Sequence, residues 1–224
     1  MINSTLINKD MPDDRSEFFL NSKYSIVIIP AGTRLWKLSS FKGSDTTIGR
    51  IGPEPEHNEK LITPWWAPVS AFRDDVLGVR ERYRRAAANG RDFRDEVRIA
   101  SAVRIDWNGL SDYQEVVLTE DCKAFWGQFA PVNTRLTYKK LSDENAKAPA
   151  KYKLTTQQIT QKLNKANNDL NKIKSRSKSF PDMLGGVPDA WQFYIPNLSK
   201  YKLKEQKTIN THDKKLVEIC LGMN

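Results

Sequence analysis

The chain has 224 residues, a formal net charge of +9, and 39% hydrophobic and 10% aromatic residues. These values allow one domain with a substantial core. No apolar run approaches the roughly 20 residues that cross a bilayer, and the first residues lack the basic start and apolar middle of a secretory signal. We therefore expect a protein made in the cytoplasm, with no membrane association, whose export would need a machine that reads other signals.

Several kinds of catalytic site are disfavoured by the residues present. The two cysteines, Cys122 and Cys220, are not spaced as a metal pair and make no disulfide framework, so we expect reduced packing residues and no metal site. Neither His57 nor His212 lies in a nucleophile motif. A Gly-rich phosphate loop with Lys-Ser/Thr is absent, which argues against hydrolysis of nucleoside triphosphates.

In chain order, residues 1–22 form a polar N-terminal extension, and residues 23–224 form one α+β domain. A strand over KYSIVII leads through a Pro-Ala-Gly-Thr turn into a second strand, Arg34 to Leu38. LITPWWAPV follows, with prolines that fix the backbone around Trp65 and Trp66. Neighbours in an extended segment point to opposite sides, so one indole should pack inward and the other should face a cleft or solvent.

The middle of the chain alternates helices and strands. Residues 71–88 predict a helix that ends at Asn89 and Gly90, and DFRDEVRIASAVRI predicts a second helix with Phe93, Val97 and Ala100 on one side. YQEVVLT and KAFWGQFA read as strands, and Glu115 is interpreted as a solvated strand position. A short helix from Lys214 to Leu221 closes the chain. The fold class is α+β.

A basic insertion is predicted at about residues 136–180. From Lys139 to Lys178 there are eleven basic and three acidic residues, a net charge of +8. The segment has few aromatic residues on which bases could stack. Within it, Thr155 or Thr156 can cap a helix whose apolar stripe should dock on the body or on a partner, namely Ile159, Leu163, Ala166, Leu170 and Ile173.

We interpret this segment as a solvated insertion, with an acidic protein or RNA as the alternative partner. Its removal should leave the core folded, because the entropy of loop closure grows slowly with length.

The late segment LGGVPDAWQFYIPNL places a glutamine among strand formers. By alternation, Trp191, Phe193 and Ile195 share one face, while Gln192 and Tyr194 share the other. The preceding pair Gly185-Gly186 lets a backbone approach a ligand closely. We expect Gln192 to face a cleft.

IPAGTRLWKL, ITPWWAPV, FWGQFAP and LGGVPDAWQFYIPNL, in this order, resemble the strands of ADP-ribosyltransferase-like bacterial toxins, including NAD-glycohydrolase toxins. The resemblance covers scattered pieces of Ser25 to Ser199. It implies a mixed or antiparallel sheet core with flanking helices, interrupted here by the basic helical insertion. It also implies a toxin or secreted effector that consumes NAD as a substrate and has an immunity or chaperone protein as a partner.

By this resemblance, Gln192 would be the catalytic residue that orients the ribose, and the cofactor-binding residues would be Arg34, Trp36, Lys37, Trp65 and Trp66. Arg34 or Lys37 would hold phosphate, and Trp65 or Trp66 would flank the nicotinamide. Arg34 and Lys37 lie on opposite faces of one strand, so only one can line the site.

Transferase members of the family usually carry Glu two residues after the position of Gln192, where this chain has Tyr194. This departure favours hydrolysis of NAD over transfer, or a fold that has lost the activity. The competing interpretation is a non-catalytic binding protein that uses the basic insertion.

Overall fold

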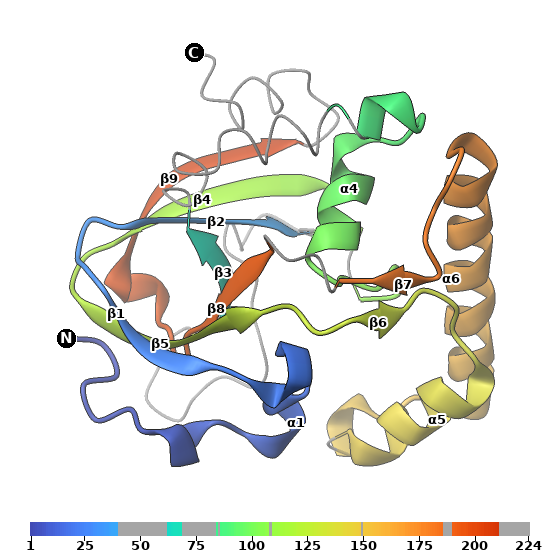
Figure 1. The fold of residues 1–224 in the computed structure, drawn as a ribbon. Coiled ribbons are helices and arrows are strands. Elements are labelled where there is room, and N and C mark those ends of the chain that lie inside the picture. Colours follow the sequence, from blue (N-terminus) through green and yellow to red (C-terminus); the bar gives the residue numbers. More distant parts are fainter. Residues whose placement is uncertain are drawn as a thin grey trace.

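Figure 1 shows a computed structural model that describes residues 1–39, 62–68, 84, 86–107, 109–148, 150–185 and 190–210. The predicted helix at Lys214 to Leu221 lies outside these residues, as do most of the predicted helix at 71–88 and His57, His212 and Cys220.

Antiparallel pairing joins seven strands into one sheet in the order β1-β5-β8-β3-β2-β4-β9. Their bounds are β1 Ser25–Ile29, β2 Arg34–Ser39, β3 Trp65–Pro68, β4 Asp112–Leu118, β5 Cys122–Gln128, β8 Trp191–Tyr194 and β9 Leu203–Asn210. The helices are α1 Asp13–Ser16, α4 Phe93–Ala100, α5 Tyr138–Lys147 and α6 Thr156–Arg176, with short 3-10 turns at Asn8–Asp10, Leu20–Ser22, Ala150–Tyr152 and Lys200–Lys202. The α+β class is confirmed, and strand β9 was not predicted.

Two tight turns curl this sheet. β1 and β2 are joined through the predicted turn at Pro30 to Thr33, although they are not neighbours in the sheet. β4 and β5 are likewise joined by three residues and are not neighbours. The turns meet, because Gly32 N–H donates to the Leu118 carbonyl at 2.8 Å and Ala31 N–H donates to Asp121 Oδ1 at 2.8 Å. The two halves of the sheet must therefore bend toward each other.

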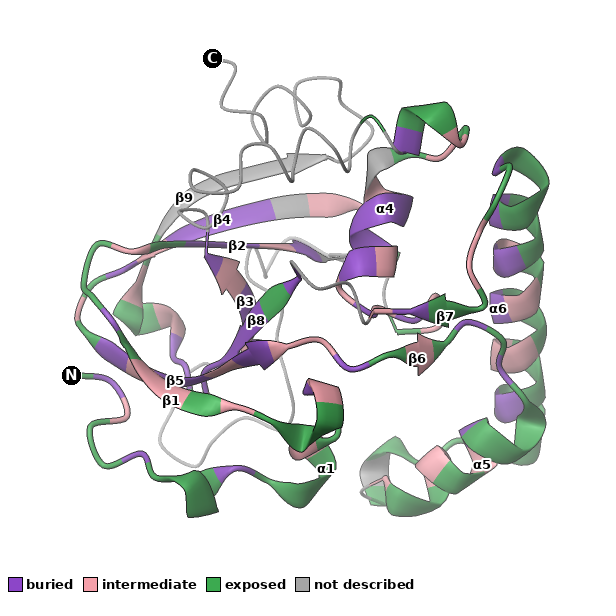
Figure 2. Cartoon of the chain, in the orientation of Figure 1, coloured by how far each residue is buried: buried purple, intermediate pink, exposed green. Residues whose placement is uncertain are grey.

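The curl gives the sheet an inner and an outer face. On the inner face, side chains from most of the strands pack into one apolar core, which includes Leu35, Trp66, Val116, Ala124, Phe193 and Ile195. On the outer face, Phe125 and Tyr194 are buried together with Leu6, Met11 and Phe19 of the N-terminal segment. The sheet is thus covered on both sides around β5 and β8 (Figures 1 and 2).

The N-terminal residues belong to the fold, which corrects our description of residues 1–22 as a polar extension. Ile2 forms a bridge with Cys122, and Phe19 forms one with Phe129. Four apolar side chains, at Ile2, Leu6, Met11 and Phe19, are buried. They are spread among polar residues without a helical or strand period, so the sequence pattern hides their burial.

The basic insertion forms two helices, α5 and α6, and α5 lies across the lower end of α6 (Figure 1). Thr155 caps α6, as predicted, in a capping box with Gln158. Ile159, Ala166, Leu170 and Ile173 are buried, so the predicted apolar stripe is confirmed. Its first part, Ile159, Leu163 and Ala166, packs on Leu136, Leu141 and Ile105, while the rest of α6 is mostly exposed (Figure 2).

A two-stranded ribbon joins the two ends of this helical insertion. β6 (Val132–Asn133) pairs antiparallel with β7 (Met183–Leu184), which brings the two ends of the insertion side by side. Beyond β7, Gly185 has a φ of +80°, and a Cβ there would lie 2.7 Å from the Ala130 carbonyl oxygen. The glycine therefore has a packing role, because only a residue without a side chain fits this approach.

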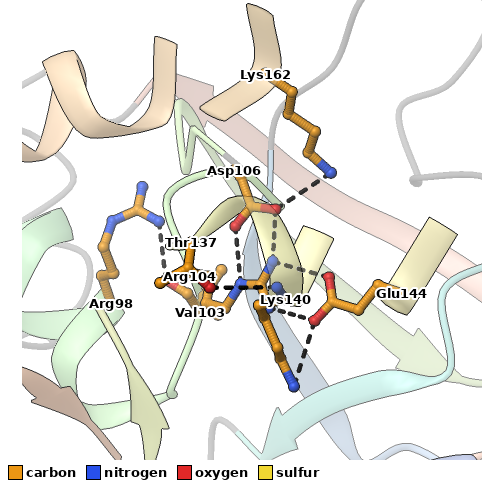
Figure 3. A network of polar contacts seen from close by, with 8 residues as sticks. All are labelled: Arg98, Val103, Arg104, Asp106, Thr137, Lys140, Glu144 and Lys162. Atoms are coloured by element: carbon orange, nitrogen blue, oxygen red, sulfur yellow. Dashed lines mark hydrogen bonds and ion pairs between the residues drawn. The ribbon is translucent and has the colours of Figure 1, made fainter. Parts of the chain in front are cut away.

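A buried ion pair of Arg104 and Asp106 fastens α5 and α6 to the body (Figure 3). Arg104, whose side chain is 2% exposed, donates to Asp106 from Nε and NH2 and to Glu144 of α5 from both terminal nitrogens. Lys162 of α6 pairs with Asp106 at 3.2 Å. Burial acts to raise the pKa of Asp106, but the hydrogen bonds and charges of Arg104 and Lys162 outweigh it and lower that pKa.

Asp106→Asn should destabilise the protein by about 3–5 kcal/mol near neutral pH. The neutral amide cannot balance the buried positive charge of Arg104 as the carboxylate does. Since the folded-state pKa is depressed, the carboxylate stabilises the fold above its unfolded pKa of about 4. This contribution disappears as pH falls through the folded pKa, so the variant should lack that part of the acid dependence. Chemical unfolding from pH 2 to 7 measures both effects, at roughly unit pH steps.

Lys165→Ala is the matched control, because Lys165 pairs with Asp169 at a side-chain exposure of 81%. It should change stability by no more than about 0.5 kcal/mol. Equal effects of the two substitutions would contradict a structural role for the buried charges.

Candidate functional site

The predicted site residues divide between the two faces of the sheet. Pairing of Trp65 with Tyr194 and of Trp36 with Ala67 places Arg34, Trp36, Trp65 and Gln192 on the outer face. Lys37 and Trp66 lie on the inner face. The expectation that Arg34 and Lys37 face opposite ways is confirmed.

On the outer face, one row of residues crosses five strands. Trp36 of β2 lies opposite Glu115 of β4 and Ala67 of β3, and Gln192 of β8 lies opposite Gly127 of β5. Continuing the β3–β8 register by one residue sets Ala67 opposite Gln192. At about 4.8 Å per strand, the backbones of Trp36 and Gln192 are about 10 Å apart, with only an alanine between them.

Gln192 is 2% exposed, and its Nε2 donates to the Phe18 carbonyl at 2.9 Å. The same carbonyl accepts the Ala130 N–H at 2.9 Å. Beside it, a Cβ on Gly127 would lie 2.5 Å from the Phe19 ring, so the N-terminal segment passes closely over this end of the row. The amide points away from bulk water, as expected, but it meets a main-chain carbonyl where we expected a cleft.

The tryptophan pair alternates as predicted. Trp66 is 2% exposed, and its indole Nε1 donates to the Thr63 carbonyl at 2.7 Å. Trp65 is half-buried among other rings, with centroid distances of 4.7 Å to Tyr194, 5.5 Å to Phe18 and 5.7 Å to Phe19. Trp66 is therefore a core residue, and Trp65 is the indole that a small displacement could expose.

Glu115 is buried, with 2% of its side chain exposed, which corrects its interpretation as a solvated position. Arg34 donates to its Oε1 from Nε at 2.8 Å and also from NH2. The Arg34 side chain itself is 46% exposed, so one face of the guanidinium remains accessible. The alternation of residues along a strand does not predict which carboxylate will form an ion pair with an arginine of the neighbouring strand.

Lys37 lies opposite Gln114 on the inner face, with its Nζ 5.5 Å from the centroid of the Trp66 ring. Burial lowers the pKa of this lysine from 10.5 to about 7. The amine thus titrates near neutral pH, while Arg34 is the cation on the outer face.

Cys122 is fully buried, and burial is the main reason that the pKa of its thiol rises to about 12. It is a packing residue, as predicted. Among the described residues, no group of three or more His, Cys, Asp or Glu side chains could hold a metal ion. None of the helices in that part of the chain is long and apolar enough to cross a membrane.

Comparison with known proteins gives no match to a family model, to a curated protein or to a solved structure. The toxin-family interpretation therefore depends on the sequence resemblance and on the geometry above.

Lys37→Met should stabilise the protein at pH 7 by more than about 1 kcal/mol, because it removes the penalty of a buried ammonium. In the parent chain the unfolded state binds more protons between pH 7 and 10.5, so stability should rise with pH over that window. The variant should lose this rise. Urea unfolding across the window measures it, with Lys204→Met, at an exposed lysine of β9, as the control; a loss of stability in Lys37→Met would contradict the burial.

Proposed function

We propose that the protein cleaves the bond between nicotinamide and ribose in NAD, at the outer face of β2, β3 and β8. The observation that carries this proposal is the arrangement of the four segments that resemble NAD-consuming toxins. They contain β2, β3, β5 and β8, which are consecutive in the sheet as β5-β8-β3-β2. Segments far apart in the sequence thus contribute to one continuous surface, as a shared site requires.

The chemistry suits the residues of that surface. As nicotinamide leaves, positive charge develops on the ribose, as it does in glycoside hydrolysis. In our proposal the Gln192 amide orients the ribose hydroxyls, and Trp65 flanks the nicotinamide ring. Water attacks the ribose carbon, which gives nicotinamide, ADP-ribose and a proton. Hydrolysis is preferred to transfer because no Glu follows Gln192 at the position the transferases use.

Arg34 is the better of the two candidate phosphate ligands. It shares the outer face with Gln192, and its guanidinium can grip a diphosphate in two-pronged fashion. Lys37 is on the other face, beside Trp66. Glu115 holds Arg34 in place through their ion pair. Trp36 lies on the same face of β2 as Arg34. A role as a toxin or secreted effector, with an immunity or chaperone partner, follows from the same resemblance.

Gln192→Ala should abolish nicotinamide release from NAD, because it removes the group proposed to orient the ribose. It should also cost about 1–3 kcal/mol of stability, since the Phe18 carbonyl loses a buried donor. Nicotinamide release and thermal unfolding are measured on the same samples.

Gln128→Ala is the matched control, an amide on the adjoining strand that faces the opposite way. It should keep the activity. Equal nicotinamide release by the parent chain and Gln192→Ala would contradict the assignment, and no release by a folded parent chain would contradict the proposed reaction.

A second candidate function is binding of RNA or an acidic protein by the surface of the segment from Lys139 to Lys178. The observation that favours it is the exposure of α6, where the Lys165 and Lys172 side chains are 81% and 76% exposed. They lie seven residues apart, so they project from one side of the helix.

For this candidate, replacing both Lys165 and Lys172 with Glu should weaken binding to a single-stranded RNA at least about tenfold at low salt. The reason is that phosphate contacts dominate such binding and depend on ionic strength. Filter binding at two salt concentrations measures it, with Lys9→Glu as the control at an exposed lysine of the N-terminal segment. Unchanged binding in the double variant would contradict a role for α6.

A further inference from the structure

Strand β1 forms one edge of the seven-stranded sheet (Figure 1). It pairs with β5 from Ser25 to Ile29, and within the part of the chain that the structure describes no strand pairs with its other side. The strand reads SIVII, with no charged residue and no proline, and its pairing with β5 has no bulge. Charges, prolines and bulges are the features that usually keep an edge strand from pairing with another chain. The edge of β1 is therefore suited to strand pairing.

The main-chain groups of Ile26 and Ile28 point away from β5. Lys123 lies opposite Ile28, but its N–H donates to the Ile2 carbonyl at 3.1 Å, on the side away from β1. Ile28 and Lys123 are therefore a non-hydrogen-bonded pair, in which both residues direct their N–H and C=O groups away from each other. Ile26 has the same orientation as Ile28, because the pattern repeats at every second residue. Two donors and two acceptors thus line the edge.

The side chains at this edge are apolar. Ile28 is 58% exposed, and Ile26 is half-buried against the cluster that contains Leu6, Met11 and Phe19. The two isoleucines share the outer face of the sheet, because side chains two residues apart point the same way. A second strand laid along the edge would cover Ile28 as well as satisfy the main-chain groups.

We propose that β1 pairs antiparallel with β1 of a second copy of this chain, about a twofold axis at Val27. In this register Ile26 of each copy lies opposite Ile28 of the other, and each of these pairs exchanges two main-chain hydrogen bonds. The Val27 residues of the two copies form the non-hydrogen-bonded pair at the centre. Each exposed Ile28 then packs against an isoleucine, and the two sheets become one. This pairing goes beyond the proposed NAD cleavage and does not depend on it.

Charges at the ends of β1 favour a second copy as the partner. The register sets Lys23 opposite Ala31 of the other copy, and the Ala31 N–H is held by Asp121 Oδ1 at 2.8 Å. Lys23 and Asp121 are both exposed. An ammonium and a carboxylate therefore meet at each end of the paired strands, and opposite charges across strands are stabilising. The strand is thus complementary to itself when it runs antiparallel.

Neighbouring registers lack this complementarity. With the axis at Ile28, Ile26 would lie opposite Pro30, which has no N–H to donate. With the axis at Ile26, Lys23 would lie opposite Ile29, which is 2% exposed, and no charge pair would form. The axis at Val27 is therefore the one that satisfies the main chain and the end charges together.

Sedimentation velocity of the full chain, from micromolar to millimolar concentration, measures the dimer, which should be weak because the interface is small. Ile28→Lys should raise its dissociation constant at least about tenfold, because a charge on an edge strand opposes pairing. Ile7→Lys is the matched control, since Ile7 is 53% exposed but lies outside β1. Ile28→Pro is a second variant, which removes an outward N–H without removing a hydrogen bond to β5 and should also weaken the dimer.

A cysteine at the twofold axis tests the register. The Cα atoms of a non-hydrogen-bonded pair are about 4.5 Å apart, a distance that a disulfide can span. Val27→Cys, in a chain that also carries Cys220→Ser, should therefore form a covalent dimer under mild oxidation. Ser25→Cys in the same chain is the control on the same face of β1, because its counterpart would be about 14 Å away.

A dimer that Ile28→Lys weakens and Ile7→Lys does not, joined through Val27→Cys, would support the proposal. A chain that is monomeric at every concentration would overturn it and leave the edge to a strand of a different protein. A dimer unchanged by both Ile28→Lys and Ile28→Pro would also overturn it, because the interface would lie elsewhere. Equal cross-linking through Ser25→Cys and Val27→Cys would overturn the register on which the pairing depends.

Discussion

Two tight turns that join strands from different parts of one sheet constrain the whole molecule. Because Pro30 to Thr33 and the three residues after Leu118 meet at the Gly32–Leu118 hydrogen bond, the sheet has to curl. Alternation along each strand gives one row of side chains on each face, and the curl turns one of these faces toward the inner core. The division of Lys37 and Trp66 from Arg34, Trp36, Trp65 and Gln192 is a direct result. The proposed chemistry is therefore confined to the outer face.

Local patterns in the sequence predicted several elements correctly. The alternation of Trp65 and Trp66, the cap at Thr155 and the apolar stripe of α6 each depend on residues close together in the chain, and each is found. The features that were missed depend on partners far away in sequence. Glu115 is buried beside Arg34 of the neighbouring strand, and the scattered apolar residues of the N-terminal segment are buried against distant residues such as Phe125 and Tyr194.

The same distinction applies to the candidate site. Alternation predicted which residues share a face with Gln192. No local pattern indicates that the Gln192 amide would donate to the carbonyl of Phe18, which is 174 residues away in the sequence. No sequence pattern singles out Trp107, because it stands in an irregular stretch between α4 and β4. Its position beside Phe18 is a product of packing, which brings the N-terminal segment, the α4–β4 connection and β3 together at one point of the surface.

The ribbon of β6 and β7 has a consequence for how this architecture can diversify. Its two strands pair the ends of the helical insertion, so the length of the chain between them can change without moving those ends apart. A related protein could have a longer or shorter insertion, or one with a different net charge, provided that it retains an acidic partner for Arg104. The proposed recognition of a partner could then evolve separately from the proposed NAD cleavage, so that the two would change at different rates in one chain.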